Sequence, residues 1–265
     1  HGGCLPRGKG FVYETGLRVP LVVYVPPKWQ HLIDEEPGTV TDRLVGFVDL
    51  APTIMSLMGV KKPDFMQGKA FLGKSREPAR EYQFGFRCNQ YPHYDPARAV
   101  TDGRYKYIRN YIPHKPYCLR NFYQWGMPAN LGWDEYVLEG GSNPKWLRPY
   151  EPKAVEMLFD IEKDPMEVNN LAGKPQFREK LGRLREVLSG HIRQVGDLGF
   201  FPETTREKDT DLYSWVRKGG YPLDELHSAV EKASQGHTSF AKDFVDYLKS
   251  EHASMRFWGA VGFCQ

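Results

Sequence analysis

The hydrophobic positions near the start of the chain form one continuous run instead of an alternating pattern. Residues 21–25 read LVVYV, are rich in β-branched side chains and follow a polar, glycine-punctuated stretch over 1–20. A continuous run of this length favours a strand buried on both faces, as in a largely parallel sheet covered by helices. We therefore expect a strand here, ended by Pro26 and Pro27, because proline cannot donate to a sheet ladder.

Two later segments carry the three- and four-residue spacing of an amphipathic helix. Residues 48–59 begin near Asp49 as a capping residue, hold Pro52 in the first turn and end at Gly59. Residues 176–195 repeat apolar residues at the same spacing, with Lys and Arg on the other face. The predicted buried faces are Leu50, Ile54, Leu57 and Met58 in the first helix, and Leu181, Leu184, Leu188, Ile192 and Val195 in the second.

The middle of the chain favours an antiparallel sheet. Strand candidates lie at 82–87, 98–101 and 105–111, and a further strand is expected within 156–165, where it ends in a turn. The sequence Thr-Asp-Gly-Arg over 101–104 predicts a hairpin turn between the second and third of these strands.

Two longer stretches lack a regular period. Residues 113–152 are rich in aromatic residues and proline, and a connection of this length inside a compact domain is usually functional or an insertion. Residues 200–220 are polar and predict a linker. Short helices are then expected over 223–234, 238–250 and 253–263.

Composition narrows the class of protein. The 265 residues are 40% hydrophobic, which is enough for a sizeable core in one to two domains. A net charge of +3 with mixed signs gives no support for binding nucleic acid, and no apolar run reaches the ~18 residues of a membrane span. The cysteines Cys4, Cys88, Cys118 and Cys264 are too sparse and irregular for a disulfide framework or a zinc knuckle.

The first twenty-six residues carry a specific resemblance. They read HGGCLPRGKGFVYETGLRVPLVVYVP, in which Gly-Lys-Gly, Tyr-Glu-Thr-Gly and Arg-Val-Pro precede the apolar run. This order resembles the second signature of the sulfatases, members of the alkaline phosphatase superfamily. Three further segments are similar to sulfatase motifs in the family's order, at 48–53 (VDLAPT), 102–108 (DGRYKYI) and 156–172 (EMLFDIEKDPMEVNNLA).

The resemblance implies the C-terminal portion of a sulfatase, closest to the heparan N-sulfatase-like branch. The expected fold is α/β: the C-terminal part of an alkaline phosphatase-like central sheet, then a smaller antiparallel-sheet subdomain and a helical tail. The expected boundaries are 1–75 for the part of the catalytic domain, 76–200 for the smaller subdomain with its packed helix, and 201–265 for the linker and tail. The last helix resembles a HEAT-type helix.

Cleavage of a sulfate ester needs cations around an anionic group while a nucleophile attacks sulfur. The resemblance implies formylglycine as that nucleophile and one calcium ion, held mostly by residues upstream because calcium prefers oxygen ligands. The match begins at His1, so the chain is expected to be cut inside the motif, to lack the nucleophile and to be inactive alone. The run Cys4-Leu5-Pro6-Arg7 is not the modification motif, since Arg follows Pro directly.

The resemblance assigns four site residues. His1 would be a calcium ligand, or else a hydrogen-bonding residue beside the metal. Lys9, between two glycines that let its ammonium approach closely, would bind sulfate and act in catalysis, unless it is a solvated surface lysine. Arg87 and His93 lie where related glycan sulfatases place substrate-binding residues, although residues 87–89 read Arg-Cys-Asn where that branch has Arg-Asp-Arg.

Other residues are expected to support this site. Glu14 and Arg18 would brace the lysine loop by capping or ion pairing. Lys106 is expected on an outer strand, away from the chemistry. The aromatic residues of 113–152 would serve packing or form a wall on which a sugar stacks.

We therefore expect a sulfuric ester hydrolase that releases sulfate from a sulfated carbohydrate and is secreted or periplasmic. One alternative is a phosphodiesterase or phosphonate hydrolase of the same superfamily, which shares the metal site. A second alternative is a non-catalytic interaction chain with a degenerate site. A Cys or Ser upstream, in a Cys/Ser-x-Pro/Ala-x-Arg motif, would favour the sulfatase.

Overall fold

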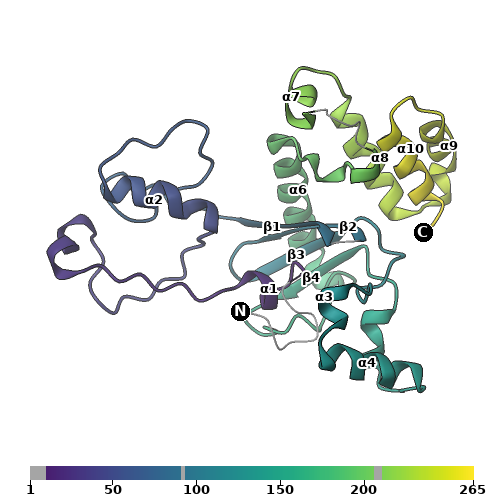
Figure 1. Ribbon diagram of the computed structural model, residues 1–265, viewed down its shortest axis with the longest axis horizontal. Coiled ribbons are helices and arrows are strands. Elements are labelled where there is room, and N and C mark those ends of the chain that lie inside the picture. The colour runs from purple at the N-terminus through teal and green to yellow at the C-terminus, as the bar shows by residue number, and fades with distance from the viewer. Residues whose placement is uncertain (1–9, 91–92, 206–210) are drawn as a thin grey trace.

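A four-stranded antiparallel sheet forms the centre of the fold (Figure 1). The computed structural model describes residues 10–90, 93–205 and 211–265. The sheet order follows the chain order, with each strand antiparallel to the next. The strands are β1 Gln83–Gln90, β2 His93–Thr101, β3 Tyr105–Asn110 and β4 Glu156–Asp160. The predicted antiparallel sheet is thus confirmed.

The turn between β2 and β3 forms as its residues predict. The Asp102 carboxylate accepts hydrogen bonds from the backbone N–H groups of Arg104 and Tyr105, at 3.1 and 2.7 Å. Gly103 has a φ of +97°, a conformation that costs glycine little because it has no Cβ. The turn sets the register in which Thr101 lies opposite Lys106.

Side chains alternate between the two faces of the sheet, and both faces are buried. One face carries Val100, Tyr107 and Leu158 into a core shared with the C-terminal helices. The other face carries Ile108 and Phe159 into a second cluster, which is covered by residues 11–13 near the start of the chain.

Helix α6, Arg178–Val195, covers the first of these faces after the short helix η4, Pro175–Phe177. Its predicted apolar face is buried at Leu181, Leu184, Leu188 and Ile192, whereas Val195 is 40% exposed. The helix ends where Gly196 takes the left-handed conformation at φ +61°.

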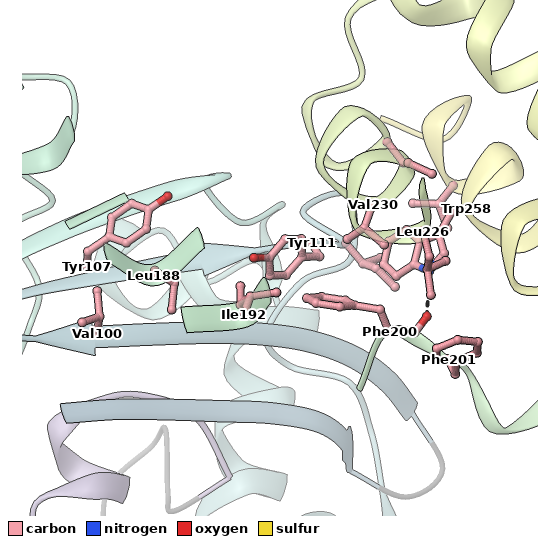
Figure 2. Packing of buried hydrophobic residues seen from close by; sticks show 14 of the residues in the cluster. Val100, Tyr107, Tyr111, Leu188, Ile192, Phe200, Phe201, Leu226, Val230 and Trp258 are labelled. Atoms are coloured by element: carbon pink, nitrogen blue, oxygen red, sulfur yellow. Dashed lines mark hydrogen bonds between the residues drawn. The ribbon is translucent and has the colours of Figure 1, made fainter. Parts of the chain in front are cut away.

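The C-terminal part of the chain forms helices that pack on the same core. The three predicted helices are present, and residues 200–220 are more than the expected linker because Phe200 and Phe201 are buried. The Trp258 indole N–H donates to the Phe200 carbonyl at 2.8 Å, a contact that Figure 2 shows within the core. The elements are η5 Leu198–Phe200, η6 Glu203–Thr205, α7 Leu212–Arg217, α8 Leu223–Gln235, η7 Thr238–Phe240, α9 Ala241–Leu248 and α10 Ala253–Gly262.

The aromatic stretch between β3 and β4 folds into short helices. Trp133 packs edge-to-face on Trp146 and Tyr150, with ring centroids 5.7 and 5.9 Å apart. Its indole N–H donates to the Trp146 carbonyl at 2.9 Å. These aromatic residues therefore serve packing. The elements are α3 Phe122–Trp125, α4 Pro128–Leu138, α5 Pro144–Leu147 and η3 Arg148–Tyr150.

The predicted buried strand at residues 21–25 is absent. Among the described residues no segment pairs with it, and Val22 and Tyr24 are 89% and 78% exposed. A strand of this type needs neighbours on both edges and helices on both faces, and the described residues supply neither. Within the described residues the segment is an extended connection between α1 Glu14–Leu17 and η1 Pro27–Leu32, so the prediction of a strand at 21–25 is wrong.

The helix predicted over 48–59 is present as η2 Phe47–Asp49 and α2 Leu50–Leu57, but the opposite face is buried. Pro52, Thr53 and Ser56 are buried, while Ile54 and Met58 are 57% and 70% exposed. The polar face is covered because the loop after it satisfies its hydroxyl groups: Thr53 accepts from the backbone N–H of Phe71, and Ser56 from that of Ser75.

Asp49 binds loop amides instead of capping α2. Its carboxylate accepts from the backbone N–H groups of Gly46 and Lys69, both at 2.8 Å, and pairs with Arg80.

Helices in the described part of the chain are too short or too polar to cross a bilayer.

Candidate functional site

Two of the four predicted site residues, His1 and Lys9, lie outside the described residues. The segment that follows Lys9 is described from Gly10 onward, and it lies directly on the sheet. Phe11, Val12 and Tyr13 are only 8%, 4% and 3% exposed, in the cluster formed with Ala97, Ala99, Ile108, Met157, Phe159 and Ile161. The chain is therefore fixed to the sheet two residues after Lys9.

Aromatic contacts hold this segment in one orientation. The Tyr13 hydroxyl donates to the Tyr117 hydroxyl at 2.8 Å, and the Phe11 and Tyr117 rings meet edge-to-face at 5.5 Å. The following turn closes on the Tyr13 carbonyl, which accepts from the N–H groups of Gly16 and Leu17 at 2.9 Å each. Tyr117 thus brings the stretch between β3 and β4 against residues 11–13, which follow Lys9 in the sequence.

Glu14 forms an ion pair, one of the two kinds of contact predicted for it, while its bracing of the lysine loop stays a prediction. Its carboxylate lies 2.8 Å from the Lys106 ammonium, which also pairs with Glu167 at 3.2 Å. Arg18, the other predicted brace, is exposed. The expected outer-strand position of Lys106 was wrong, because β3 is an inner strand of the sheet and the Lys106 side chain is 1% exposed. Its expected distance from the chemistry stays a prediction.

A buried charge cluster, defined as Arg87, Asp95 and Lys153, adjoins Phe11. Asp95 accepts from Arg87 Nη1 at 2.9 Å and from Lys153 Nζ at 2.6 Å, and the Arg87 guanidinium lies 4.3 Å from the centre of the Phe11 ring. Burial lowers the pKa of both cationic groups against the opposing charge of Asp95. Asp95 thus pairs with two cationic side chains.

The structure places Arg87 in this cluster and His93 at the start of β2, two residues before Asp95. Arg87 is 8% exposed, so little of its side chain is open to direct contact with a ligand. His93 begins β2, and its Nε2 lies 2.7 Å from the Arg120 carbonyl. That contact ties the start of β2 to the stretch over 113–152.

Sequence reasoning missed Asp95 and Lys153. Asp95 is a carboxylate inside a strand whose neighbours are buried, and an isolated charge in an apolar pattern was the one signal available. Lys153 had no such signal, because it follows the irregular aromatic stretch and meets Asp95 only in the folded chain.

The described residues do not fit a calcium cage. No group of three or more His, Cys, Asp or Glu side chains gathers within ranges 10–90, 93–205 and 211–265. The role of His1 therefore stays a prediction. Cys88, Cys118 and Cys264 are free thiols.

Comparisons with known proteins agree with the sequence motifs. Residues 7–126 match the family model for the C-terminal part of N-sulphoglucosamine sulphohydrolase. An ulvan-active sulfatase of Formosa agariphila is 37% identical over 207 residues, which is 77% of this chain and 33% of that protein. A second ulvan-active sulfatase of the same organism is 32% identical over 254 residues, or 92% of this chain and 46% of that protein. The chain thus spans between a third and a half of these relatives.

A solved structure of a 2-O GAG sulfatase is also similar. It covers 56% of this chain and 25% of its own, at 23% identity and a TM-score of 0.36. The family model and the two relatives carry the assignment, because the matched residues include the Gly-Lys-Gly segment and the sheet strands β1 to β3. Residues 7–126 match the C-terminal part of N-sulphoglucosamine sulphohydrolase, and the chain as a whole belongs to the sulfatase family.

Proposed function

We propose that this chain belongs to a sulfuric ester hydrolase that releases sulfate from a sulfated carbohydrate. One observation carries the proposal: the segment that follows the Gly-Lys-Gly motif is anchored on the sheet beside the Arg87–Asp95–Lys153 cluster. The relatives' names support the substrate class, since they refer to ulvan and to N-sulphoglucosamine.

Lys9 is the residue that we propose to bind the sulfate group. Negative charge builds on the sulfonyl oxygens and on the leaving group as the ester bond breaks, so a fixed ammonium stabilises the transition state more than the bound substrate. We propose that Arg87 binds substrate through its positive charge and that His93, at the start of β2, contacts the sugar.

The family's calcium ion and formylglycine stay part of the proposal for the intact enzyme, with His1 as the residue of this chain nearest the metal. The roles proposed for the described residues do not depend on the calcium ion or on formylglycine. We further propose that residues 1–75 complete the catalytic domain, that 76–200 form the smaller subdomain and that 201–265 form the tail. A secreted or periplasmic location completes the proposal.

Replacement of Lys9 in the intact enzyme tests this function. Lys9→Ala is expected to lower kcat by ~10²–10³, the usual loss when one preorganised contact to the transition state is removed. Lys9→Arg is expected to restore activity only in part, because a planar guanidinium does not replace a compact charge between two glycines. The measurement is kcat and KM on a sulfated sugar, with a melting curve for each variant.

The control is Lys74→Ala, which removes an exposed lysine and is expected to leave kcat unchanged. A folded Lys9→Ala enzyme with the activity of the parent would refute the sulfate-binding role. Turnover of an aryl sulfate by the 265-residue chain alone, purified from a sulfatase-free host, would show that the nucleophile lies elsewhere than proposed. Faster turnover of a phosphate diester than of the sulfate would favour the phosphodiesterase alternative.

A further inference from the structure

Three charged side chains meet beneath the turn that follows the lysine loop, and they form a second charge cluster of Lys106, Glu14 and Glu167. The Lys106 ammonium lies 2.8 Å from Glu14 Oε1 and 3.2 Å from Glu167 Oε1. Glu167 Oε2 also accepts the backbone N–H of Glu14 at 2.6 Å. One carboxylate, that of Glu167, thus binds both the cation and the backbone of the turn.

This second charge cluster is buried. The Lys106 and Glu167 side chains are 1% and 0% exposed. Removing charges from water is costly, and well-packed apolar residues are often at least as stable as a buried ion pair. Ion pairs and hydrogen bonds are directional, whereas apolar contacts are not. They therefore fix the position of a segment more specifically than apolar packing does.

The backbone at Glu167 supports a positional role. Of the non-glycine residues that the structure describes, Glu167 alone has a positive φ, at 50°. That conformation is disfavoured for a residue with a Cβ, and it persists where surrounding contacts fix it. The contacts here include the local turn, in which the Glu167 N–H donates to the Asp164 carbonyl at 2.9 Å, and the side-chain contacts to Lys106 and Glu14.

We infer that Lys106, together with Glu167, is a positioning residue for Lys9: it fixes the side chain and backbone of Glu14, and so holds the described segment that follows Lys9 in the sequence. The inference rests on the proposed function of Lys9. Lys106 acts through Lys9 and does not itself meet the substrate.

Lys106→Met tests the inference in the intact enzyme, alone and combined with Lys9→Ala. The single variant keeps the volume of the side chain but loses its charge. It is expected to lower kcat by ~10–10², since a displacement near 1 Å at a reacting group costs about that much. In the Lys9→Ala background the same change is expected to have almost no further effect, because the residue through which it acts is gone.

Arg109→Met is the matched control. Arg109 is a buried cation on the same strand and pairs with a glutamate at the same 2.8 Å, but its partner Glu231 lies on α8 in the tail. Loss of this pair is expected to lower the melting temperature while kcat stays that of the parent. A general loss of stability is thereby separated from a loss of position.

A structural measurement complements the kinetics. Hydrogen exchange at the Gly16 and Leu17 amides, which bond to the Tyr13 carbonyl, is expected to quicken in Lys106→Met and to stay unchanged in Arg109→Met. If Lys106→Met does not fold, Glu14→Gln provides the same cycle with a milder change, because the Glu14 side chain is 15% exposed.

The outcomes distinguish the two proposals. Losses that add in the double variant would overturn the positioning role, and so would unchanged exchange at the turn. If Lys9→Ala alone leaves kcat unchanged, the sulfate-binding role fails instead, whatever Lys106→Met does. A loss of kcat that appears in Lys106→Met, vanishes in the Lys9→Ala background and is absent from Arg109→Met would establish the inference.

Discussion

Single buried charges connect distant parts of this fold. Arg98 on β2 is 3% exposed and donates through Nε and Nη2 to the two carboxylate oxygens of Asp197, at 2.5 and 2.9 Å. Asp197 follows the end of α6 and also accepts the backbone N–H of Gly199. Burial alone would raise the pKa of the Asp197 carboxyl, but Arg98 outweighs it and holds the pKa below its usual value.

Asp197→Asn is expected to destabilise the chain by about 3 kcal/mol at pH 7, because it leaves the Arg98 guanidinium buried without a counter-charge. A carboxyl with a depressed folded-state pKa contributes stability above its unfolded value of about 3.9, and that contribution is lost as the pH falls toward the folded value. The difference in the free energy of unfolding between parent and variant should therefore become smaller below pH ~4. Urea unfolding at pH 7 and pH 3 measures this difference, and equal differences at the two pH values would contradict this account.

At the scale of elements, local patterns predicted which segments are helical but not always which face is buried. In α6 the apolar stripe meets the sheet. In α2 a stripe of similar quality faces outward, because the loop over 68–77 covers the polar face instead. The spacing of apolar residues reports a face that can be buried, and neighbouring elements decide whether it is.

The two ends of the α6 stripe provide a test. The pattern places Leu184 and Val195 on one face, yet Leu184 is 0% and Val195 is 40% exposed. Leu184→Ala is expected to lower the free energy of unfolding by ~2–5 kcal/mol through lost burial and a cavity. Val195→Ala should change it by ~0.5 kcal/mol or less, as for most exposed positions. Chemical denaturation of both variants decides, and equal losses would show that the stripe is buried along its whole length.

At the scale of the whole molecule, apolar side chains gather outside the core near residues 21–65. Figure 1 shows α2 and its flanking loops projecting to one side of the sheet. Several large apolar residues there are mostly exposed, namely Val22, Tyr24, Val40, Phe47, Ile54, Met58 and Phe65. Exposed apolar surface of this kind promotes association, so we expect the 265-residue chain to be poorly soluble and to self-associate.

Replacing Val22, Tyr24, Ile54 and Met58 together with Ser is expected to shift the chain toward monomer and to leave the melting temperature nearly unchanged, because these side chains contribute little to the core. Sedimentation velocity over a range of concentrations measures the change. In the control, Phe122 and Leu138, which are exposed in the aromatic stretch between β3 and β4, are replaced with Ser. This change should leave self-association as it is in the parent chain. A monodisperse parent chain would refute the expectation.

The sequence by itself determined features that depend on neighbouring residues. Hydrophobic spacing located α6 and the strands, Asp102 and Gly103 located the hairpin turn, and the motif around Lys9 identified the family. Each of these signals is complete within a few residues, since helix period, turn chemistry and glycine conformations are local properties.

The tertiary structure alone decided features that depend on partners far along the chain. Residues 21–25 have the composition of a buried strand but no strand beside them among the described residues. Lys106 was expected on an outer strand, and it is buried because Glu14, near the start of the described chain, and Glu167, in the turn after β4, both reach it. Asp95 and Lys153 pair across 58 residues. Burial and ion pairing each depend on two segments that meet in the folded chain. The pattern within one segment does not identify the other segment.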